Sequence, residues 1–243
     1  VAMTDHGNMF GAVQFYHAAK EHGIKPIIGC EVYVSQQGRA ARSDADRYNH
    51  LVLLCENQQG YRNLIKLVSA GYLEGFYYKP RIDRDLLASH SEGLIGLSAC
   101  LRGDVNELLL AGRYEEARRR ALQYADIFGR GNFFLELQDH GLEQDRTLLP
   151  QVYRLSQETG IPVVATNDSH YLHKDDARAH EILLCIQTGK TISDPSRMKP
   201  WGPEFYLKSR AEMMALFGEV EEALDRTWEI AERCRVRIKK IAE

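Results

Sequence analysis

Short runs of apolar and β-branched residues alternate along the chain with longer segments in which apolar residues recur every three or four positions. The first kind of run is typical of buried strands and the second of amphipathic helices. Strands are expected at 1–4, 27–34, 50–55, 94–100, 133–137 and 162–166, and helices at 9–21, 59–73, 104–110, 114–128 and 145–158. Such alternation predicts βαβ units, and therefore an α/β fold with a parallel sheet or barrel.

Two segments interrupt the alternation. Residues 36–47 are polar and rich in Gly, Ala and Ser, which predicts a loop. Residues 193–203 hold three Pro and no periodic apolar positions, which predicts a linker or an extended arm. A short strand at 204–207 and helices near 209–217 and 219–234 are expected to follow.

Two domains are therefore expected: a barrel over residues 1–190, and a linker with a C-terminal helical appendage over residues 191–243. The first residues, Val1-Ala2-Met3-Thr4, are already strand-like. We therefore expect that the chain begins inside a structural element and that the opening strand of the barrel is missing from it.

Composition limits the classes of function. Of 243 residues, 31 are Lys or Arg and 34 are Asp or Glu, which gives a net charge of −3. A protein that bound nucleic acid over its whole surface would have a clear basic excess. No apolar run approaches the ~20 residues that span a membrane. The five Cys form no Cys-x-x-Cys pair, and their odd number favours reduced thiols, so we expect a cytoplasmic location without membrane contact.

Residues of metal-ligand type recur near the ends of the predicted strands. In a parallel α/β barrel, the working groups gather at the carboxyl ends of the strands. Imidazole, carboxylate and thiolate are ligands of Zn²⁺, Mn²⁺ or Fe²⁺. Asp168 and His170 stand two residues apart, so they share one face of an extended segment. The complete candidate set is His6, Glu31, His50, Cys100, Asp168 and His170.

Each candidate also has a purely structural explanation. Asp5-His6-Gly7-Asn8 is typical of a turn with a helix N-cap, and Cys100 alone is typical of a small buried hydrophobe. Glu31 could occupy a solvent-facing strand position, although an unpaired buried carboxylate is costly. His50 alone could be an ordinary surface or core histidine. These explanations weaken together, because they require several unrelated polar residues to fall near strand ends by accident.

Other polar residues fit such a site less well. Glu136 and His140 follow a predicted strand and could line the same mouth, in a supporting or substrate-facing role at most. The run Arg118-Arg119-Arg120 lies beside Glu115-Glu116, which favours a solvated helix face over a phosphate groove. No Gly-rich phosphate loop and no Gly-x-Ser-x-Gly elbow occurs. The remaining histidines are assigned to the surface: His17, His22, His90, His173 and His180.

Six segments have distinctive sequences: TDHGN at 4–8, GCEVY at 29–33, YNHLVLL at 48–54, GFYYKPR at 75–81, FLELQ at 134–138 and ATNDSHYL at 165–172. Taken in order, they resemble the N-terminal polymerase and histidinol phosphatase (PHP) domain of bacterial DNA polymerase III alpha subunits. The segment Phe205-Tyr206-Leu207-Lys208-Ser209, with Glu212-Met213, resembles the stretch that leads from that domain into the polymerase palm.

The resemblance implies a distorted, TIM-like (β/α)7 barrel of the PHP type, whose cleft binds up to three divalent metal ions. The family's ligands match the same six candidates, and a further His-x-His pair and an Asp would precede Val1. Zinc is the expected metal, with manganese or iron as alternatives. Glu31, His6 and Asp168 are the expected catalytic residues.

The resemblance further implies a part of a DNA-directed DNA polymerase, a nucleotidyltransferase of DNA replication. Its PHP site would be a metal-dependent phosphoesterase and 3′→5′ exonuclease that acts on a DNA 3′ terminus. The polymerase carboxylates would lie downstream, so this chain is not expected to polymerise DNA. Other replicase subunits, an exonuclease subunit and the sliding clamp, are the expected partners.

Two alternatives stay open. The domain could be a non-catalytic structural module that docks a separate proofreading subunit. It could also be a free-standing PHP phosphatase that acts on small phosphate esters, although the polymerase-like segment at 205–213 argues against this.

Overall fold

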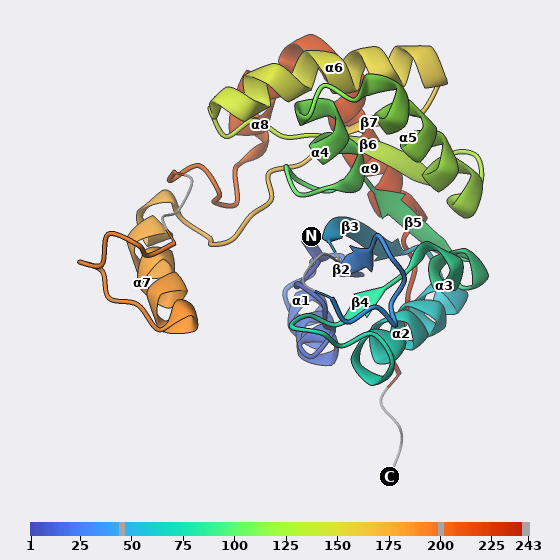
Figure 1. The fold of residues 1–243 in the computed structure, drawn as a ribbon, viewed down its shortest axis with the longest axis horizontal. Coiled ribbons are helices and arrows are strands. Elements are labelled where there is room, and N and C mark those ends of the chain that lie inside the picture. Colours follow the sequence, from blue (N-terminus) through green and yellow to red (C-terminus); the bar gives the residue numbers. More distant parts are fainter. Residues whose placement is uncertain (44–46, 199–201, 240–243) are drawn as a thin grey trace.

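The strands form a curled, mixed half-barrel with helices packed around it (Figure 1). The structure, a computed structural model, describes residues 1–43, 47–198 and 202–239. The strands within these ranges are β1 Ala2–Met3, β2 Ile27–Ser35, β3 Tyr48–Cys55, β4 Arg81–Ile82, β5 Leu94–Leu97, β6 Phe133–Leu137 and β7 Val163–Ala165. They pair in the order β1-β2-β3-β5-β6-β7, and β4 pairs with β2. The predicted α/β class is confirmed, and the curled half-barrel is consistent with the expected distorted barrel of the PHP type.

Most predicted helices are confirmed, and α4, α5 and the strand β6 match the prediction to the residue. Gly129, at φ +80°, ends α5, because glycine adopts this backbone region without a steric penalty. The α-helices of the described ranges are α1 Ala12–Glu21, α2 Gln58–Leu73, α3 Arg84–Ser89, α4 Asp104–Leu110, α5 Tyr114–Phe128, α6 Glu143–Thr159, α7 Ala177–Thr188, α8 Arg210–Phe217 and α9 Glu221–Arg233. Short 3₁₀ turns precede two of them, η1 Lys174–Asp176 and η2 Gly218–Val220.

The expectation of a parallel sheet is wrong at β3, which runs antiparallel to both β2 and β5. The other pairs, β1–β2, β2–β4, β5–β6 and β6–β7, are parallel. A parallel crossover needs a dozen or more residues and usually a helix, whereas β2 and β3 are joined by the loop predicted at 36–47. Residues 44–46 of that loop lie outside the described part of the chain.

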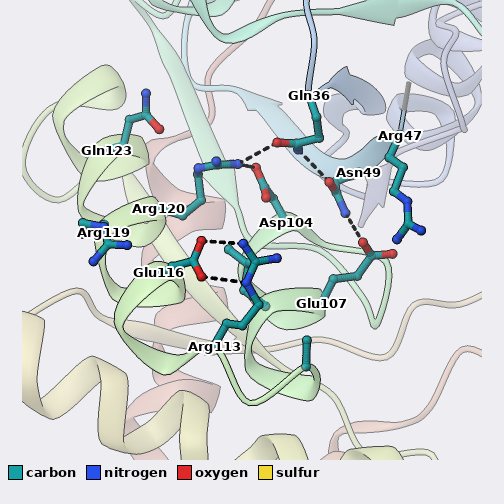
Figure 2. A pocket seen from close by; sticks show the side chains of 12 residues that line it. Gln36, Arg47, Asn49, Asp104, Glu107, Arg113, Glu116, Arg119, Arg120 and Gln123 are labelled. Carbon is teal, nitrogen blue, oxygen red and sulfur yellow. Dashed lines mark hydrogen bonds and ion pairs between the residues drawn. The ribbon is translucent and has the colours of Figure 1, made fainter. Parts of the chain in front are cut away.

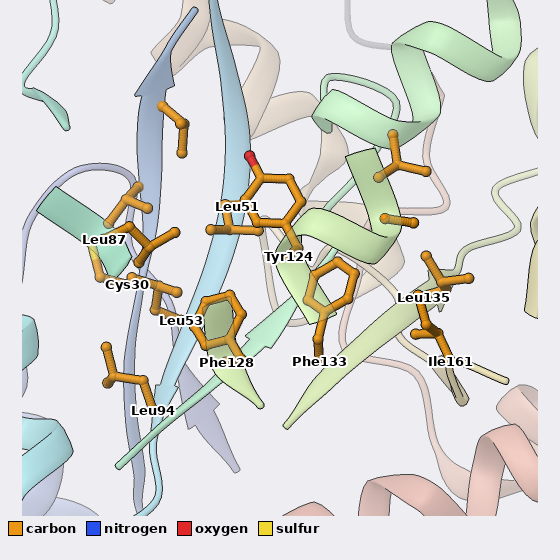
Figure 3. Close-up of a cluster of buried hydrophobic side chains, with 14 of the residues drawn as sticks. Cys30, Leu51, Leu53, Leu87, Leu94, Tyr124, Phe128, Phe133, Leu135 and Ile161 are labelled. Carbon is orange, nitrogen blue, oxygen red and sulfur yellow. The ribbon is translucent and has the colours of Figure 1, made fainter. Parts of the chain in front are cut away.

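The two faces of the sheet carry different side chains because neighbouring residues on a strand point to opposite sides. Along β3, Leu51 and Leu53 join the large cluster beneath the outer helices, together with Tyr124 and Phe128 of α5 (Figure 3). Val52 and Leu54 face the other way into a second apolar cluster, which also holds residues of β5, β6 and β7. The candidate residue His50 shares this second, inner face.

The last helix belongs to the inner cluster. Ile230 of α9 and Cys234, directly after it, are buried there together with Val164 of β7. Arg233 reinforces the attachment by donating from Nε to the Glu56 carboxylate at 3.0 Å. The predicted C-terminal helices are therefore present, and α9 packs on the half-barrel; the domain boundary between 190 and 191 stays a prediction.

The segment before these helices is an extended arm. Residues 193–198 and 202–203 lie outside helices and strands, as expected for a linker, and residues 199–201 of that linker lie outside the described residues. The strand predicted at 204–207 is wrong: among the described residues it is reduced to one isolated bridge, between Tyr206 and Tyr171. Figure 1 shows that α7, which precedes this linker, stands away from the half-barrel.

Candidate metal centre

His6 lies beside Glu31 because the chain after β1 continues along β2. The main-chain N–H of Glu31 donates to the Asp5 carbonyl at 3.1 Å, and that of Gly7 donates to the Glu31 carbonyl at 2.8 Å. Gly7 then turns the chain at φ +68°, where a Cβ atom would lie 2.9 Å from the Tyr33 ring. The turn predicted at Asp5–Asn8 is therefore present, and it holds the His6 imidazole over the inner face. The predicted helix N-cap in this segment is wrong, because α1 begins at Ala12 with Gly11 as its N-cap residue, which forms no side-chain hydrogen bond.

Sheet register brings His50 to the same carboxylate. In the β2–β3 pair, Glu31 faces Val52 and Tyr33 faces His50, so Glu31 and His50 are diagonal neighbours on one face. Nδ1 of His50 contacts Oε1 of Glu31, and Nδ1 of His6 lies 3.6 Å from the same oxygen. One ligand atom from each of the three residues lies within 4.8 Å of the other two.

The Glu31 carboxylate is buried, with 5% of the residue exposed, so the solvent-facing alternative is wrong. Its Oε1 atom has no hydrogen-bond partner among the described residues, although two imidazole nitrogens converge on it. A buried carboxylate oxygen without a hydrogen bond is costly, and a cation would compensate it. Two imidazoles and a carboxylate are a donor set that zinc and similar ions accept, so these residues fit a metal.

Cys100 lies at the edge of this group, 3.8 Å from Nδ1 of His50 through its Sγ atom. The turn after β5 is held by Asn106, whose side-chain amide donates to the Cys100 carbonyl at 2.9 Å. Burial raises the pKa of the Cys100 thiol well above its ordinary value, and the charges of Asp168 and Glu31 raise it further. A nearby cation would favour the thiolate, because it offsets these contributions.

Asp168 and His170 form a second pair, with 3.6 Å between Oδ2 and Nε2. Asp168 has a left-handed backbone at φ +43°, an uncommon conformation outside glycine. Burial alone would raise the pKa of Asp168, but the contact with His170 lowers it below its usual value. The same contact raises the pKa of His170. The His170 ring centroid lies 6.0 Å from that of His6, which links this pair to the first group.

Six candidates therefore line one region, but they are not equally close. His6, Glu31 and His50 form the tight group, and the other three surround it. Their role as metal ligands stays a prediction at this point.

A comparison with protein families identifies the chain. The profile of the PHP domain matches residues 1–140. The chain belongs to the PHP domain family.

Relatives of known name agree with this assignment. DNA polymerase III subunit alpha of Treponema pallidum is 50% identical over 98% of this chain, and that of Borreliella burgdorferi is 47% identical over 96%. The corresponding subunit of Thermus aquaticus is 46% identical over 97% of this chain. The chain spans about one fifth of the length of these relatives. It is therefore homologous to the PHP-domain region of DNA polymerase III alpha subunits.

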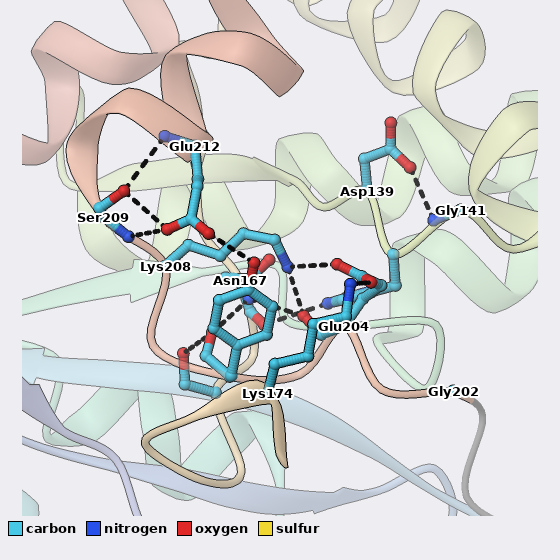
Figure 4. Close-up of polar contacts among 12 residues, drawn as sticks. Asp139, Gly141, Asn167, Lys174, Gly202, Glu204, Lys208, Ser209 and Glu212 are labelled. Carbon is cyan, nitrogen blue, oxygen red and sulfur yellow. Dashed lines mark hydrogen bonds and ion pairs between the residues drawn. The ribbon is translucent and has the colours of Figure 1, made fainter. Parts of the chain in front are cut away.

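The match to the PHP domain profile ends at residue 140, before Asp168 and His170. The segment that carries this pair is held by residues 202–212, which we call the arm from here on, and Figure 4 shows Asn167 beside Glu204 of this arm. Asn167 donates through Nδ2 to the main-chain carbonyls of Glu204 and Tyr206, at 3.0 and 2.7 Å. The main-chain N–H of His170 donates to the Phe205 carbonyl at 2.8 Å. The arm thus fixes the backbone on both sides of Asp168.

Two supporting residues lie behind the pair, and for them the sequence indicated at most a supporting role. His140 is buried, its Nε2 lies 3.0 Å from the Asn167 carbonyl, and its ring stacks on Phe205 at 3.9 Å. The pKa of Glu136 is raised to about 7, mainly because the group is buried. The charges of Glu31 and Asp168 raise it as well, and a hydrogen bond from Thr166 Oγ1 lowers it.

Sequence reasoning missed three contributors to this region. Asn167 and Phe205 hold the Asp168 segment; both lie in the distinctive segments 165–172 and 205–209, but no pattern in the sequence indicated that these segments meet. His180, assigned to the surface, is half-buried on α7 with its ring centroid 5.3 Å from that of His170. In the part of the chain that the structure describes, no helix combines the length and apolar character needed to cross a membrane.

Proposed function

We propose that this PHP domain is the part of a bacterial DNA polymerase III alpha subunit that holds divalent metal ions and hydrolyses phosphodiesters at a DNA 3′ terminus, as a 3′→5′ exonuclease. The observation that carries the proposal is the buried Glu31 Oε1, which lacks a hydrogen bond while two imidazoles converge on it. The donor set of imidazole, carboxylate and thiolate favours zinc, with manganese or iron as alternatives.

The six candidates would hold the ions. Glu31, His6 and His50 would form the central ligand group, with Cys100 on one side and Asp168 and His170 on the other. When bound, divalent ions lower the pKa of a coordinated water and stabilise the leaving oxygen of a phosphodiester. Glu31, His6 and Asp168 are the residues that we assign to catalysis.

The chain's own contribution is to hold these groups in place and to set their charge. The contact with His170 keeps Asp168 ionised despite its burial. The arm fixes the left-handed backbone at Asp168, so its carboxylate has a defined direction. Glu136 can hold or release a proton near neutral pH at its carboxyl group, directly behind the site.

The test is metal content, measured by elemental mass spectrometry on the chain purified without chelator, together with hydrolysis of a 3′-labelled oligonucleotide. We expect bound zinc, manganese or iron and a metal-dependent shortening from the 3′ end. His170→Ala and Asp168→Ala should lose both. His22→Ala is the matched control and should lose neither, because this exposed imidazole contacts the Ala18 carbonyl of the preceding helix and lies outside the candidate set. Hydrolysis that survives in Asp168→Ala would contradict the assignment.

A second candidate function, docking of a separate proofreading subunit, is supported by the apolar surface of α7. Ile182, Leu183 and Ile186 are 46%, 61% and 70% exposed on this helix. Contiguous exposed apolar residues are typical of interaction sites. If docking is the function, Leu183→Glu should prevent co-sedimentation with a purified exonuclease subunit while metal content stays unchanged.

The setting of the whole protein is part of the same proposal. If the chain is part of a DNA polymerase III alpha subunit, its substrate would be DNA and its location the cytoplasm. Its partners would be the other replicase subunits, which include an exonuclease subunit and the sliding clamp.

A further inference from the structure

A pocket of about 560 Å³ lies between α4, α5 and the strand ends that flank the loop at 36–47 (Figure 2). Gln36 follows β2, Arg47 precedes β3, and Asn49 lies on β3. Asn49 points away from the face that carries His50, because neighbours on a strand alternate. The pocket is therefore separate from the candidate metal centre, and its volume lies in the range of about 300–1,000 Å³ that ligand sites have.

The carboxylates of this pocket are already engaged. Asp104, 6% exposed, accepts a hydrogen bond from Tyr124 Oη at 3.1 Å and pairs with Arg120. Glu116 pairs with Arg113, with 2.7 Å between Oε1 and Nε.

The third carboxylate, Glu107, accepts from Asn49 Nδ2 at 2.8 Å and lies 3.3 Å from Arg102 Nε. Every acidic group of the pocket therefore already has a donor of its own, although the charge of Glu116 also acts on Arg119 and Arg120 of the same helix.

Guanidinium donors remain free in the same pocket. The guanidinium groups of Arg47 and Arg119 line it, and neither has a dashed contact to another of the residues drawn in Figure 2. Arg120 forms its contacts with Asp104 and with Gln36 Oε1 through Nη1, which leaves its other N–H groups available. The Arg118–Arg120 run, which the sequence assigned to a solvated face, is therefore divided: Arg119 and Arg120 face the pocket, and Arg118 does not line it.

We infer that this pocket binds the phosphate group of a nucleotide. The planar guanidinium fork matches phosphate oxygens in a bidentate manner, and Arg47, Arg119 and Arg120 offer three such forks around one cavity. Leu108 and Ala111 add an apolar part to the wall, which suits a sugar or base better than an inorganic anion. The ligand is a free nucleotide or one nucleotide of a single strand, since both present the same chemistry.

The test is isothermal titration calorimetry on the full chain with three probes: dTMP, an oligo-dT octamer without terminal phosphate, and inorganic phosphate. EDTA is present throughout, so metal-dependent binding at the candidate centre cannot contribute, and failure of the proposed exonuclease would not affect the result. Arg119→Gln and Arg47→Gln remove exposed side chains, and circular dichroism confirms that each variant folds. Arg118→Gln, the adjacent arginine outside the pocket, is the matched control.

We expect dTMP or the octamer to bind more tightly than inorganic phosphate, and Arg119→Gln to weaken that binding about tenfold, because a charge-assisted contact to phosphate is lost. Arg118→Gln should change it less than about twofold. Binding of dTMP identifies the free nucleotide as the ligand, and binding of the octamer alone identifies the strand. Equal weakening by Arg118→Gln and Arg119→Gln, or no binding of either nucleotide probe, would overturn the inference.

Discussion

Glu31, in the middle of β2, and Asp104, the first residue of α4, are both buried carboxylates, with 5% and 6% of each residue exposed, but their partners differ. Asp104 lies between the guanidinium groups of Arg84 and Arg120 and accepts the Tyr124 hydroxyl hydrogen bond. Glu31 meets only imidazoles, and its Oε1 has no hydrogen bond among the described residues.

The difference teaches which buried charge belongs to the scaffold and which to a ligand site. A charge that the chain compensates with arginine is already paired without a ligand, because the guanidinium group keeps its positive charge. A buried carboxylate that meets imidazole groups in place of guanidinium groups would be compensated by a bound cation. Burial alone therefore does not identify a functional carboxylate, whereas the nature of its partners does.

The largest effect is expected from Asp104→Ala. The change leaves two partly buried guanidinium groups without their shared acceptor, so the free energy of unfolding should fall by about 3 kcal/mol or more. Urea denaturation followed by circular dichroism measures it. Asp126→Ala, on the exposed face of the same helix α5 that carries Arg120, should stay within about 0.5 kcal/mol of the parent. A small effect of Asp104→Ala would remove the contrast with Glu31.

Glu31→Gln should weaken metal binding strongly and change the free energy of unfolding little, which is the opposite of the effect expected for Asp104→Ala. Metal affinity should fall about a hundredfold or more, because the central carboxylate ligand is lost. The free energy of unfolding in EDTA should change little or rise, since the variant buries no charge. Metal titration and urea denaturation of the same samples provide both values. A loss of stability in EDTA as large as that of Asp104→Ala would show that Glu31 is also a scaffold charge.

His140→Phe tests how far the arm determines the candidate centre. The variant keeps a ring to stack on Phe205 but loses the contact between Nε2 and the Asn167 carbonyl. Residues that orient ligands typically change metal affinity 10- to 100-fold, so we expect about a tenfold loss. Calorimetric metal titration provides the measurement, and an unchanged affinity would mean that the arm holds Asp168 without help from His140.

The smallest effect on the free energy of unfolding is expected at Asp83, a half-buried carboxylate. Burial raises the pKa of Asp83, but hydrogen bonds from the main chain and side chain of Arg39 and from the Leu86 N–H lower it below 3.8. A lowered pKa stabilises the folded state at neutral pH, and this contribution is lost as the pH falls through the folded-state value. Asp83→Asn should therefore cost about 0.5–1 kcal/mol at pH 7 and almost nothing well below pH 3.8. Urea denaturation at both pH values checks the sign.

Local structure could be predicted closely. The bounds of α4, α5 and β6 agree to the residue, because periodic apolar positions and flanking glycines act within a few residues of chain. The ligand types of the candidate centre were also evident, since His6, Cys100, Asp168 and His170 lie next to predicted strands. The antiparallel direction of β3 was missed because the alternation of strands and helices was extended across a loop that contains no helix.

Contacts between segments that are far apart in the chain could not be predicted from the sequence. Asn167 and Phe205 hold Asp168 through contacts that span more than thirty residues, and no local pattern indicates that the segments 165–172 and 205–209 meet. The arginine run beside Glu115 and Glu116 was taken for a solvated face. Its division between pocket and surface depends on where α4 and the loop at 36–47 meet α5.

The sequence by itself determined most of the secondary structure, the α/β class and the chemical types that could bind a metal, because these follow from side-chain pattern and composition. Only the tertiary structure decided which charges are compensated. Register placed His50 diagonally from Glu31, and packing of α4 against α5 placed Arg120 on Asp104. Both depend on distances between segments far apart in the chain, and electrostatic interaction is decided by those distances and by the exclusion of water around them.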